Sequence, residues 1–379
     1  PITRMQIEST IWIKKDLAKK TADIKLDESE LESMFENKTI VRTVSSDKKE
    51  EAKPSIISLL DPNRRQNVSI FFSSFRMSNE DILESILGMD ESKLHDSKLS
   101  KLISNLPTSE EIAQQKEFEG DENLLDVPDK FIRSIMKIPR VNHRLNSWMF
   151  KMKFNEILGD LRPDIETVTE ACNELTGDPN WLMLLQIILS IGNFLNAAKK
   201  NKVVHGFQIR SLQKLNTIKS ADKTTSLLQY IHLFLQKNYS ELENFPEKLK
   251  NIRAVTRVAI ENIPKQVETL QINLTKVQTE VEHAEGSPFS NDNFAQVMKE
   301  FYKQASKNVE KINTSFEKMQ KCLKDVAVGY GEKEVEFMKD PGSFFSVVSD
   351  FFDEYDKMKS KNDKAKAIED RKRRLAGKS

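Results

Sequence analysis

The side chains that most often carry catalysis or metal binding are scattered along this sequence. The five histidines (positions 95, 143, 205, 232 and 283) include no pair with metal-ligand spacing on one helix. Neither Cys172 nor Cys322 has a histidine or a basic cluster beside it in sequence that could activate its thiol. There is no glycine-rich phosphate loop, and the abundant carboxylates fall on the solvated faces of predicted helices. The sequence therefore predicts a protein that is not an enzyme and that uses no metal or cofactor.

The run Ile70-Phe71-Phe72, followed by Phe75, places three consecutive large apolar side chains around most of the girth of one helix. A surface helix buries only about half of its circumference. One of the three is therefore free to face solvent and to meet a partner. The alternative is that all three belong to the core of a helical bundle, and helical periodicity alone favours this alternative.

A second candidate for binding is the basic segment 199–223, which has seven Lys or Arg residues and one acidic residue. Clustered lysines would steer an acidic protein partner onto this segment and make its binding sensitive to salt. An ordinary solvated loop is the alternative. The whole chain carries a formal net charge of only +1, so its charge indicates neither a nucleic-acid partner nor a membrane partner.

The elements that position these residues are predicted to be helices. Only 11 glycines and 12 prolines occur among 379 residues, and 31% of the residues are charged, a composition typical of long solvated helices. With two cysteines no disulfide framework is evident, which indicates a reducing, cytoplasmic compartment. No apolar run reaches the ~20 residues needed to cross a bilayer. We therefore expect an all-α cytoplasmic protein.

The first part of the chain reads as a short arm, a linker and a helical subdomain. Residues 1–37 predict one short acidic helix after Trp12, with too little apolar surface to fold alone. Residues 38–55 mix charges of both signs with serines, as a tether or a surface loop would, and could reach up to roughly 60 Å. A compact helical subdomain follows, which begins at Asp61-Pro62 and contains two capping-box patterns, Ser78-x-x-Asp81 and Thr108-x-x-Glu111.

The rest of the chain predicts long helices. One is expected to start after Pro163, and the next, from Trp181 to about Ala198, is apolar nearly all round and so belongs in the middle of a bundle. After a polar break at 199–225, helix resumes at Leu227. Two apolar stripes with coiled-coil-like spacing, 260–281 and 294–326, predict an antiparallel helix pair joined by a short loop. A final helix begins near Pro341 and ends in a basic tail at 357–379.

The sequence from Gly192 onward contains an ordered series of short motifs: Gly192-Asn193-Phe194-Leu195-Asn196, Gly206-Phe207, Leu212-x-x-Leu215 and Lys219-Ser220-Ala221-Asp222. Their order resembles the signature of the formin homology-2 domain. The first element alone would be weak evidence, whereas the ordered set is specific. The resemblance extends over nearly the whole chain, from Asn67-Val68-Ser69-Ile70 at the start of the family's knob to Lys137-Ile138-Pro139-Arg140 and Phe150-Lys151-x-Lys153-Phe154 on the approach to its post.

The resemblance implies an elongated all-α architecture that dimerises head to tail into a ring. Its parts are an N-terminal lasso, a flexible linker, a knob, a coiled-coil region with a post, and a basic tail, here 1–37, 38–60, 61–145, 146–356 and 357–379. Lassos of the family carry an earlier Trp within a W-x-K-[IL] element. Because this chain starts at Pro1, we expect its lasso to be truncated at the N-terminus.

In the family the lasso of each subunit wraps the post of the other. Trp12 is therefore expected to fill a pocket on the partner's post. A glycine inside a helix costs about 1 kcal/mol relative to alanine, and Gly192 would allow the arriving lasso a close approach. Two asparagines would bond the lasso backbone. The dimerisation residues implied in this way are Trp12, Gly192, Asn193, Asn196, Gly206 and Phe207.

The resemblance also implies that the chain nucleates actin filaments as a homodimer and then rides processively on their barbed ends. Ile70 would be the knob residue that inserts into the hydrophobic cleft of actin, and Lys219 would be a basic actin contact, with Lys223 beside it. Profilin would act only through a proline-rich region outside this chain. A passive coiled-coil scaffold and a membrane-binding helical dimer are the alternatives.

Overall fold

The computed structural model describes residues 56–197 and 204–376. Within these ranges the regular structure is helical, apart from two isolated β-bridges that join Ile57 to Leu125 and Lys219 to Ser226. The predicted all-α class is therefore confirmed. Trp12, the expected lasso and most of the expected linker lie outside the described residues.

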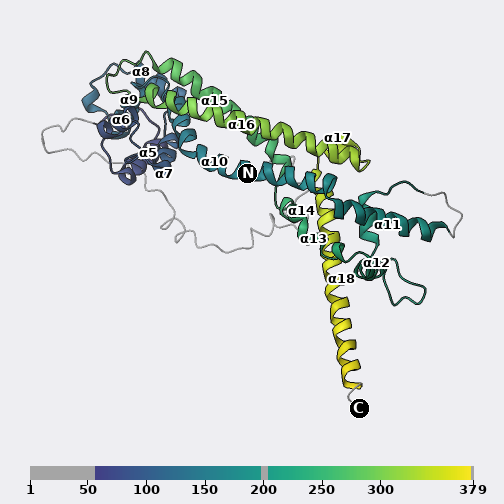
Figure 1. Ribbon diagram of the computed structural model, residues 1–379. Coiled ribbons are helices and arrows are strands. Elements are labelled where there is room, and N and C mark those ends of the chain that lie inside the picture. Colours follow the sequence, from purple (N-terminus) through teal and green to yellow (C-terminus); the bar gives the residue numbers. More distant parts are fainter. Residues whose placement is uncertain (1–55, 198–203, 377–379) are drawn as a thin grey trace, which may run out of the picture. The chain divides into compact units, whose positions relative to one another are not determined.

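Helices of very different length alternate along the described chain (Figure 1). The α-helices are α5 (Pro62–Phe75), α6 (Asn79–Leu87), α7 (Asp96–Ser104), α8 (Ser109–Glu117), α9 (Val127–Met136), α10 (Val141–Gly177), α11 (Pro179–Ala197), α12 (Leu227–Asn238), α13 (Phe245–Lys248), α14 (Lys250–Val255), α15 (Ile263–Ala284), α16 (Phe294–Gly329), α17 (Glu334–Phe337) and α18 (Pro341–Ala376). Short 3-10 helices lie between them: η2 (Glu122–Leu124), η3 (Ile209–Lys214), η4 (Ser240–Leu242) and η5 (Ile260–Asn262).

Local signals set the starts of the helices as the sequence predicts. Asp61 caps α5 through its side chain, and Pro62 occupies the first turn. Both predicted capping boxes form, at the starts of α6 and α8. Helix α12 begins at Leu227, after Ser226 caps it, and α16 ends at Gly329 with Gly331 in the left-handed region at φ 67°.

The last residues of the expected linker already belong to the folded unit. Ser58 donates its hydroxyl to Asp129 Oδ2 at 3.1 Å, and the backbone N–H of Leu59 points to the same carboxylate. Leu60 is buried. Contacts with the folded unit therefore begin at Ile57, whose backbone bonds Leu124 and Asp126, before the boundary expected at residue 61. The buried Asp129 on α9 adds to them by accepting the hydroxyl and backbone donors of Ser58 and Leu59.

Helix α10 corrects one prediction. We expected a helix to start after Pro163, but α10 runs without a break from Val141 to Gly177. A proline removes one backbone donor and crowds the carbonyl four residues earlier, which here is that of Gly159. Buried side chains lie on both sides of the proline, among them Leu161 and Ile165, and their packing outweighs the loss of one hydrogen bond.

Helices α15 and α16 form the predicted antiparallel pair and pack against α10 (Figure 1). Hydrogen bonds between their side chains show the antiparallel direction, because residue numbers increase along α15 while those of their partners on α16 decrease. Gln271 donates to Asn313 at 2.7 Å, Tyr302 to Gln278 at 2.8 Å, and Lys299 to Glu285 at 3.2 Å. The two apolar stripes therefore meet each other and α10 in a bundle of three long helices.

Two ion pairs fasten the start of α10 to this pair of helices. Arg144 and Asp292 meet at 2.6 Å, with side chains only 4% and 2% exposed. The Arg144 guanidinium also lies 5.1 Å from the centre of the Phe294 ring. Nearby, Arg140 donates to Glu280 at 3.0 Å, and Glu280 is buried. The loop between α15 and α16 is thus tied to α10 by charge as well as by apolar contact.

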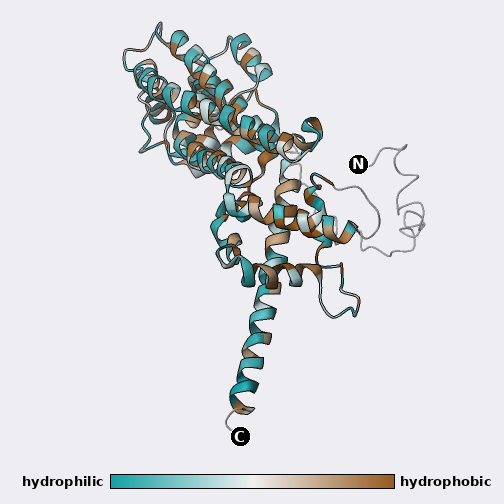
Figure 2. Ribbon diagram, turned by 45° about the vertical axis from the view of Figure 1, so that its right-hand side comes forward, coloured by the Kyte–Doolittle hydropathy of each residue, from teal (hydrophilic) through white to brown (hydrophobic). Residues whose placement is uncertain are grey.

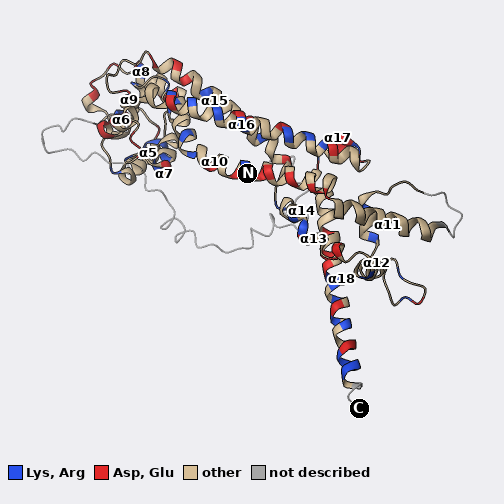
Figure 3. Ribbon diagram, in the orientation of Figure 1, with Lys and Arg blue, Asp and Glu red and all other residues tan. Residues whose placement is uncertain are grey.

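The remaining helices surround an aromatic core. Trp181 of α11 is fully buried and packs against Phe352 of α18 and Phe245 of α13. Its indole N–H donates to Tyr330 Oη at 2.7 Å, and that hydroxyl donates to the Leu175 carbonyl at 2.6 Å. Burial raises the pKa of Tyr330 to about 12. The C-terminal half of α18, beyond this core, is mostly hydrophilic and carries charges of both signs (Figures 2 and 3).

Candidate functional site

The exposed side of α5 is the first candidate surface. Ile70 is 59% exposed, whereas Phe71 and Phe75 are buried and Phe72 is partly buried. Successive helical residues are about 100° apart, and Ile70 lies on the side of α5 away from the face formed by the buried Val68, Phe71 and Phe75. The expectation that one of the three apolar residues faces solvent is therefore confirmed for Ile70, and the alternative that all three are core is wrong.

The buried side of α5 explains why Ile70 is left outside. Phe72 contacts Phe131 of α9 edge-on at 4.7 Å between ring centres, and Phe71 contacts Phe75 at 4.8 Å. These rings already fill the space between α5 and α9. An isoleucine on the outer side adds nothing to this core. It remains available to a partner at little cost to the fold.

The second candidate surface is a groove between α11 and α12, which we call the α11–α12 groove. It has a volume of about 740 Å³ and is lined by Ser190, Ile191, Phe194, Leu195, Ile218, Lys219, Ser220, Thr225, Ser226, Leu227 and Tyr230. Phe194 is 79% exposed, an unusual state for a phenylalanine, and Leu195, Ile218 and Tyr230 are also exposed. Such a contiguous apolar surface is typical of a protein-binding site.

Helix α11 therefore differs from its prediction. Its nearly continuous apolar sequence indicated burial in the middle of a bundle, yet only some of its faces are buried in the described part of the chain. Trp181, Leu184 and Ile188 face the core, whereas Phe194 and Leu195 lie on the surface. Figure 3 shows that α11 is almost free of charge along its whole length. An uncharged helix with an exposed apolar end needs a cover from another chain or segment.

Three of the residues predicted for dimerisation lie beside this groove, whereas Trp12 is outside the described residues. Gly192, Asn196 and Phe207 line a neighbouring pocket of about 410 Å³, which shares Ile191, Leu195 and further residues with the α11–α12 groove. A Cβ atom added at Gly192 would meet nothing within 4 Å, so the helix surface at this glycine is open. Gly206 is exposed and lines a further pocket together with Phe207.

Asn193 makes its hydrogen bonds within its own chain. Its amide nitrogen donates to the Val204 carbonyl, and its amide oxygen accepts from the Val204 N–H, both at 3.0 Å. This pair of bonds anchors the returning end of the loop that follows α11. Within one chain the Asn193 side chain therefore positions Val204, which lines the pocket, and its bonds to a partner's lasso stay a prediction.

A tight hairpin presents the two predicted lysines. Residues 218–227 are closed by backbone bonds from Leu227 N–H to the Ile218 carbonyl at 2.8 Å and from Ser220 N–H to the Thr225 carbonyl at 2.8 Å. Both Lys219 and Lys223 are exposed. Lys219 also lines the α11–α12 groove, whereas Lys223 sits at the tip in the left-handed region at φ 60°.

Asp222 holds the shape of this hairpin. Its carboxylate accepts hydrogen bonds from the Ser220 hydroxyl at 2.5 Å and from the hydroxyl and N–H of Thr224 at 2.8 and 3.1 Å. Hydrogen bonds from Ser220 and Thr224 keep the pKa of Asp222 below its ordinary value. The one acidic residue of the basic segment is therefore occupied locally, and the lysines present their charge to solvent.

The sequence does not predict the exposed apolar lining of the α11–α12 groove. In the sequence, Phe194 and Leu195 stand out only as members of a family motif. The signal in the sequence is that α11 is apolar on nearly all sides, which predicts burial in the middle of a bundle.

Among the described helices, none combines the length and the apolar character required of a membrane-spanning segment.

Comparison with known proteins matches the chain to one family. The family model described as "Formin Homology 2 Domain" matches residues 1–356. Formin-A of Dictyostelium discoideum is 30% identical over 364 residues, 94% of this chain and 29% of the relative. Protein diaphanous homolog 3 of Homo sapiens is 29% identical over 318 residues, 82% of this chain and 27% of the relative.

A third relative comes from another named group. Disheveled-associated activator of morphogenesis 2 of Mus musculus is 29% identical over 300 residues, 78% of this chain and 26% of the relative. The chain thus spans between 26% and 29% of the length of these three curated relatives. The match covers both candidate surfaces, since Ile70 and the α11–α12 groove lie within residues 1–356.

Proposed function

Because this chain belongs to the Formin Homology 2 Domain family, we propose that it assembles actin filaments, nucleating them as a homodimer and then remaining on their barbed ends as they grow. The observation that carries the proposal is the family match over residues 1–356. Two exposed apolar surfaces with no cover among the described residues, one on α5 and one between α11 and α12, support it. The role is positional, so no catalytic group is required of this chain.

In the proposed mechanism each surface has one occupant. The exposed Ile70 on α5 inserts into an apolar cleft of an actin subunit, and Lys219 and Lys223, on the hairpin beside the α11–α12 groove, make separate charged contacts with actin. The α11–α12 groove and the pocket beside Gly192 receive the N-terminal arm of a second copy, with Trp12 as its anchor. Two actin-binding bridges per dimer then hold subunits in filament-like register, and one bridge can step while the other holds.

Bulk actin assembly tests the proposal. The purified chain, added to actin monomers with a fluorescent reporter, should shorten the lag before filaments appear and should alter growth from preformed barbed ends. Nucleation explains the shorter lag because the dimer replaces the unfavourable first association of actin subunits. A passive coiled-coil scaffold or a membrane-binding dimer would change neither quantity, and that result would exclude the proposal.

Phe194→Ser should weaken self-association of the chain by about 10- to 100-fold, because burial of a phenylalanine side chain contributes about 1.5–3 kcal/mol. The unfolding midpoint of the monomer should not change, since the ring is 79% exposed. Sedimentation velocity over a concentration series measures the change. Val335→Ser on α17, at a valine that is 72% exposed outside the groove, is the control.

A double-mutant cycle identifies the occupant of the groove. If Trp12 packs against Phe194 across the dimer, Trp12→Ala should weaken association in the wild-type chain but have little further effect on Phe194→Ser. If the losses of dimer affinity in the two single variants are fully additive, Trp12 does not contact Phe194. If neither single variant changes the dimer, the proposed lasso contact is wrong.

Lys219→Ala should slow association with actin several-fold at low salt, and Lys223→Ala should have a smaller effect. Exposed charges act mainly on the rate of encounter, and their contribution fades as the Debye length shortens from about 10 Å at 0.1 M salt. The assembly rate should therefore depend less on salt concentration in the variant that combines Lys219→Ala and Lys223→Ala. Lys237→Ala, at an exposed lysine on α12, is the control. Equal effects for Lys219 and Lys237 would contradict the assignment.

A further inference from the structure

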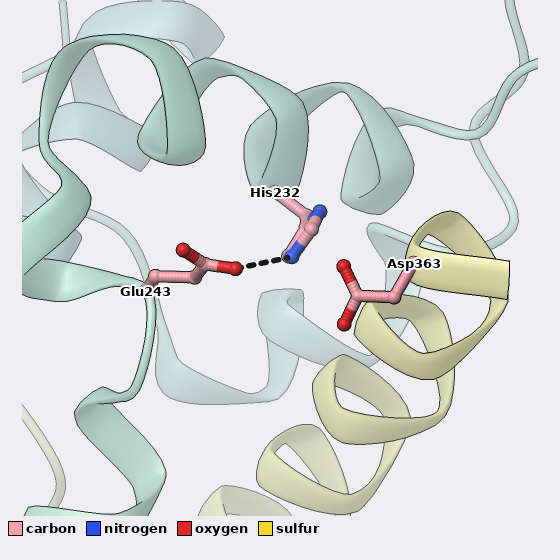
Figure 4. A group of neighbouring side chains, drawn as sticks. All are labelled: His232, Glu243 and Asp363. Atoms are coloured by element: carbon pink, nitrogen blue, oxygen red, sulfur yellow. Dashed lines mark ion pairs between the residues drawn. The ribbon is translucent and has the colours of Figure 1, made fainter. Parts of the chain in front are cut away.

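His232 lies in an unusual environment for a histidine. It belongs to α12, its side chain is fully buried, and its Nε2 atom has no hydrogen-bond partner among the described residues. Figure 4 shows its ring pointing into the space between Glu243 and Asp363. Glu243 Oε1 lies 3.8 Å from Nε2, too far for a hydrogen bond. A buried polar atom without a hydrogen-bond partner destabilises the folded state. A ligand bound to Nε2 would remove this destabilisation.

Three elements distant in sequence bring these side chains together. His232 lies on α12, Glu243 follows η4, and Asp363 lies on α18. Their potential ligand atoms all lie within 4.8 Å of one another. A tetrahedral site with bonds of about 2.0–2.2 Å places its ligand atoms about 3.4 Å apart. Glu243 is partly exposed and Asp363 is exposed, so neither carboxylate is held by complete burial while the ligand atoms move closer to an ion.

The far side of the His232 ring is also held in place. Its Nδ1 atom lies 2.9 Å from the amide nitrogen of Asn362, which is itself buried, and the amide oxygen of Asn362 accepts from Gln229 at 3.0 Å. With both amide groups flipped, the Asn362 amide oxygen accepts a hydrogen bond from Nδ1–H and its amide nitrogen donates to Gln229, so that Nε2 carries a free lone pair. Histidine ligands of metals commonly donate their second ring nitrogen to such a partner.

The charges around the ring favour a cation. Burial lowers the pKa of His232, so the ring is neutral and able to act as a ligand. Two carboxylates face it, and one ammonium group, that of Lys359, lies close and bonds Asn244. The ring of Tyr355 packs beside His232 at 5.6 Å between centres, and burial keeps the pKa of its hydroxyl well above the ordinary value. The cluster therefore has a net negative charge.

We propose that His232, Glu243 and Asp363 bind a divalent transition-metal cation of the Zn²⁺ class, with water as the fourth ligand. One imidazole and two carboxylates suit Zn²⁺ better than Mg²⁺ or Ca²⁺, which prefer oxygen ligands only. The bound ion would link α18 to α12 directly. Because α12 also contributes to the α11–α12 groove, the metal would hold the C-terminal helix against the element that carries the candidate dimer surface.

Calorimetric titration of the chelator-treated, tag-free full chain with Zn²⁺ tests this proposal. We expect one high-affinity site per chain, an upward shift of the unfolding temperature on binding, and the visible absorption of tetrahedral Co²⁺ when cobalt is used instead. Mg²⁺ and Ca²⁺ should produce no such shift. Glu243→Gln and Asp363→Asn should each raise the Zn²⁺ dissociation constant at least about tenfold, and both lie at the surface, so the fold should persist by circular dichroism.

Asp370→Asn is the matched control, because Asp370 is an exposed carboxylate on the same helix outside the cluster. It should bind Zn²⁺ as the wild type does. The proposal fails if the wild type shows no one-to-one binding. It also fails if Zn²⁺ binds equally well to Glu243→Gln, Asp363→Asn and Asp370→Asn, since the ion then sits elsewhere. Neither result bears on actin assembly, which is measured separately.

Discussion

Replacing Ile70 with alanine should lower the rate of actin filament assembly about tenfold or more while the chain keeps its fold. The side chain is 59% exposed, so its removal should change the free energy of unfolding by less than about 0.5 kcal/mol. At an interface, by contrast, a large apolar anchor in a pocket contributes about 2 kcal/mol or more. Bulk assembly and thermal unfolding of the same preparation measure the two effects.

Two control variants make this prediction specific. Ile272→Ala removes another exposed isoleucine, 47% exposed on α15, and should leave assembly unchanged. Phe71→Ala removes the buried neighbour of Ile70 and should instead destabilise the chain by about 3–5 kcal/mol. Full assembly activity in Ile70→Ala would show that α5 does not contact actin through this residue.

Asp292→Asn should destabilise the chain by about 3–5 kcal/mol, since it leaves the buried Arg144 guanidinium without its counter-charge. Both side chains are almost completely buried, and they tie the loop between α15 and α16 to α10. Urea unfolding followed by circular dichroism measures the loss as a lower midpoint with an unchanged slope.

The same loop supplies the control. Glu285 and Lys299 form an exposed pair at 3.2 Å, with side chains 59% and 72% exposed. Glu285→Gln should therefore change stability by less than about 1 kcal/mol. If Asp292→Asn were no more destabilising than Glu285→Gln, the buried pair would not hold the helices together.

The Arg144–Asp292 pair should also make the fold sensitive to acid. Burial alone would raise the pKa of Asp292, but hydrogen bonds from Ser287, Arg144 and the Phe294 N–H outweigh it, so the pKa lies below the ordinary value of 3.8. The unfolded chain then binds the proton first. The contribution of Asp292 is complete above pH 3.8 and is lost as the pH falls through the folded-state pKa. Asp292→Asn should lack this part of the pH dependence.

Local signals in the sequence are sufficient to predict where several of the helices begin. The Asp61 cap and the two capping boxes act within one turn of backbone, and the stripes of α15 and α16 repeat often enough to define a packed face. Pro163 shows the limit of such signals. Its intrinsic tendency to end a helix was overridden by the packing of Leu161, Ile165 and other residues of α10, which depends on helices distant in sequence.

The candidate sites divide in the same way. The girth of one helix indicates that one of Ile70, Phe71 and Phe72 is free to face solvent, and the family resemblance singles out Ile70, which is 59% exposed. The exposure of Phe194 and Leu195 could not be predicted, because an apolar helix has the same sequence pattern whether it packs against its own chain or against another chain. The cluster of His232, Glu243 and Asp363 could not be predicted either. Its residues lie on three separate elements and have no metal-ligand spacing in the sequence.

Imaging of single growing filaments with a fluorescently labelled chain tests the central claim most directly. The proposal predicts that labelled molecules stay at the growing barbed end while many actin subunits add, and that each spot bleaches in two steps, one for each copy of the dimer. Labelled molecules that never remain at growing ends, or that remain there as single copies, would contradict it.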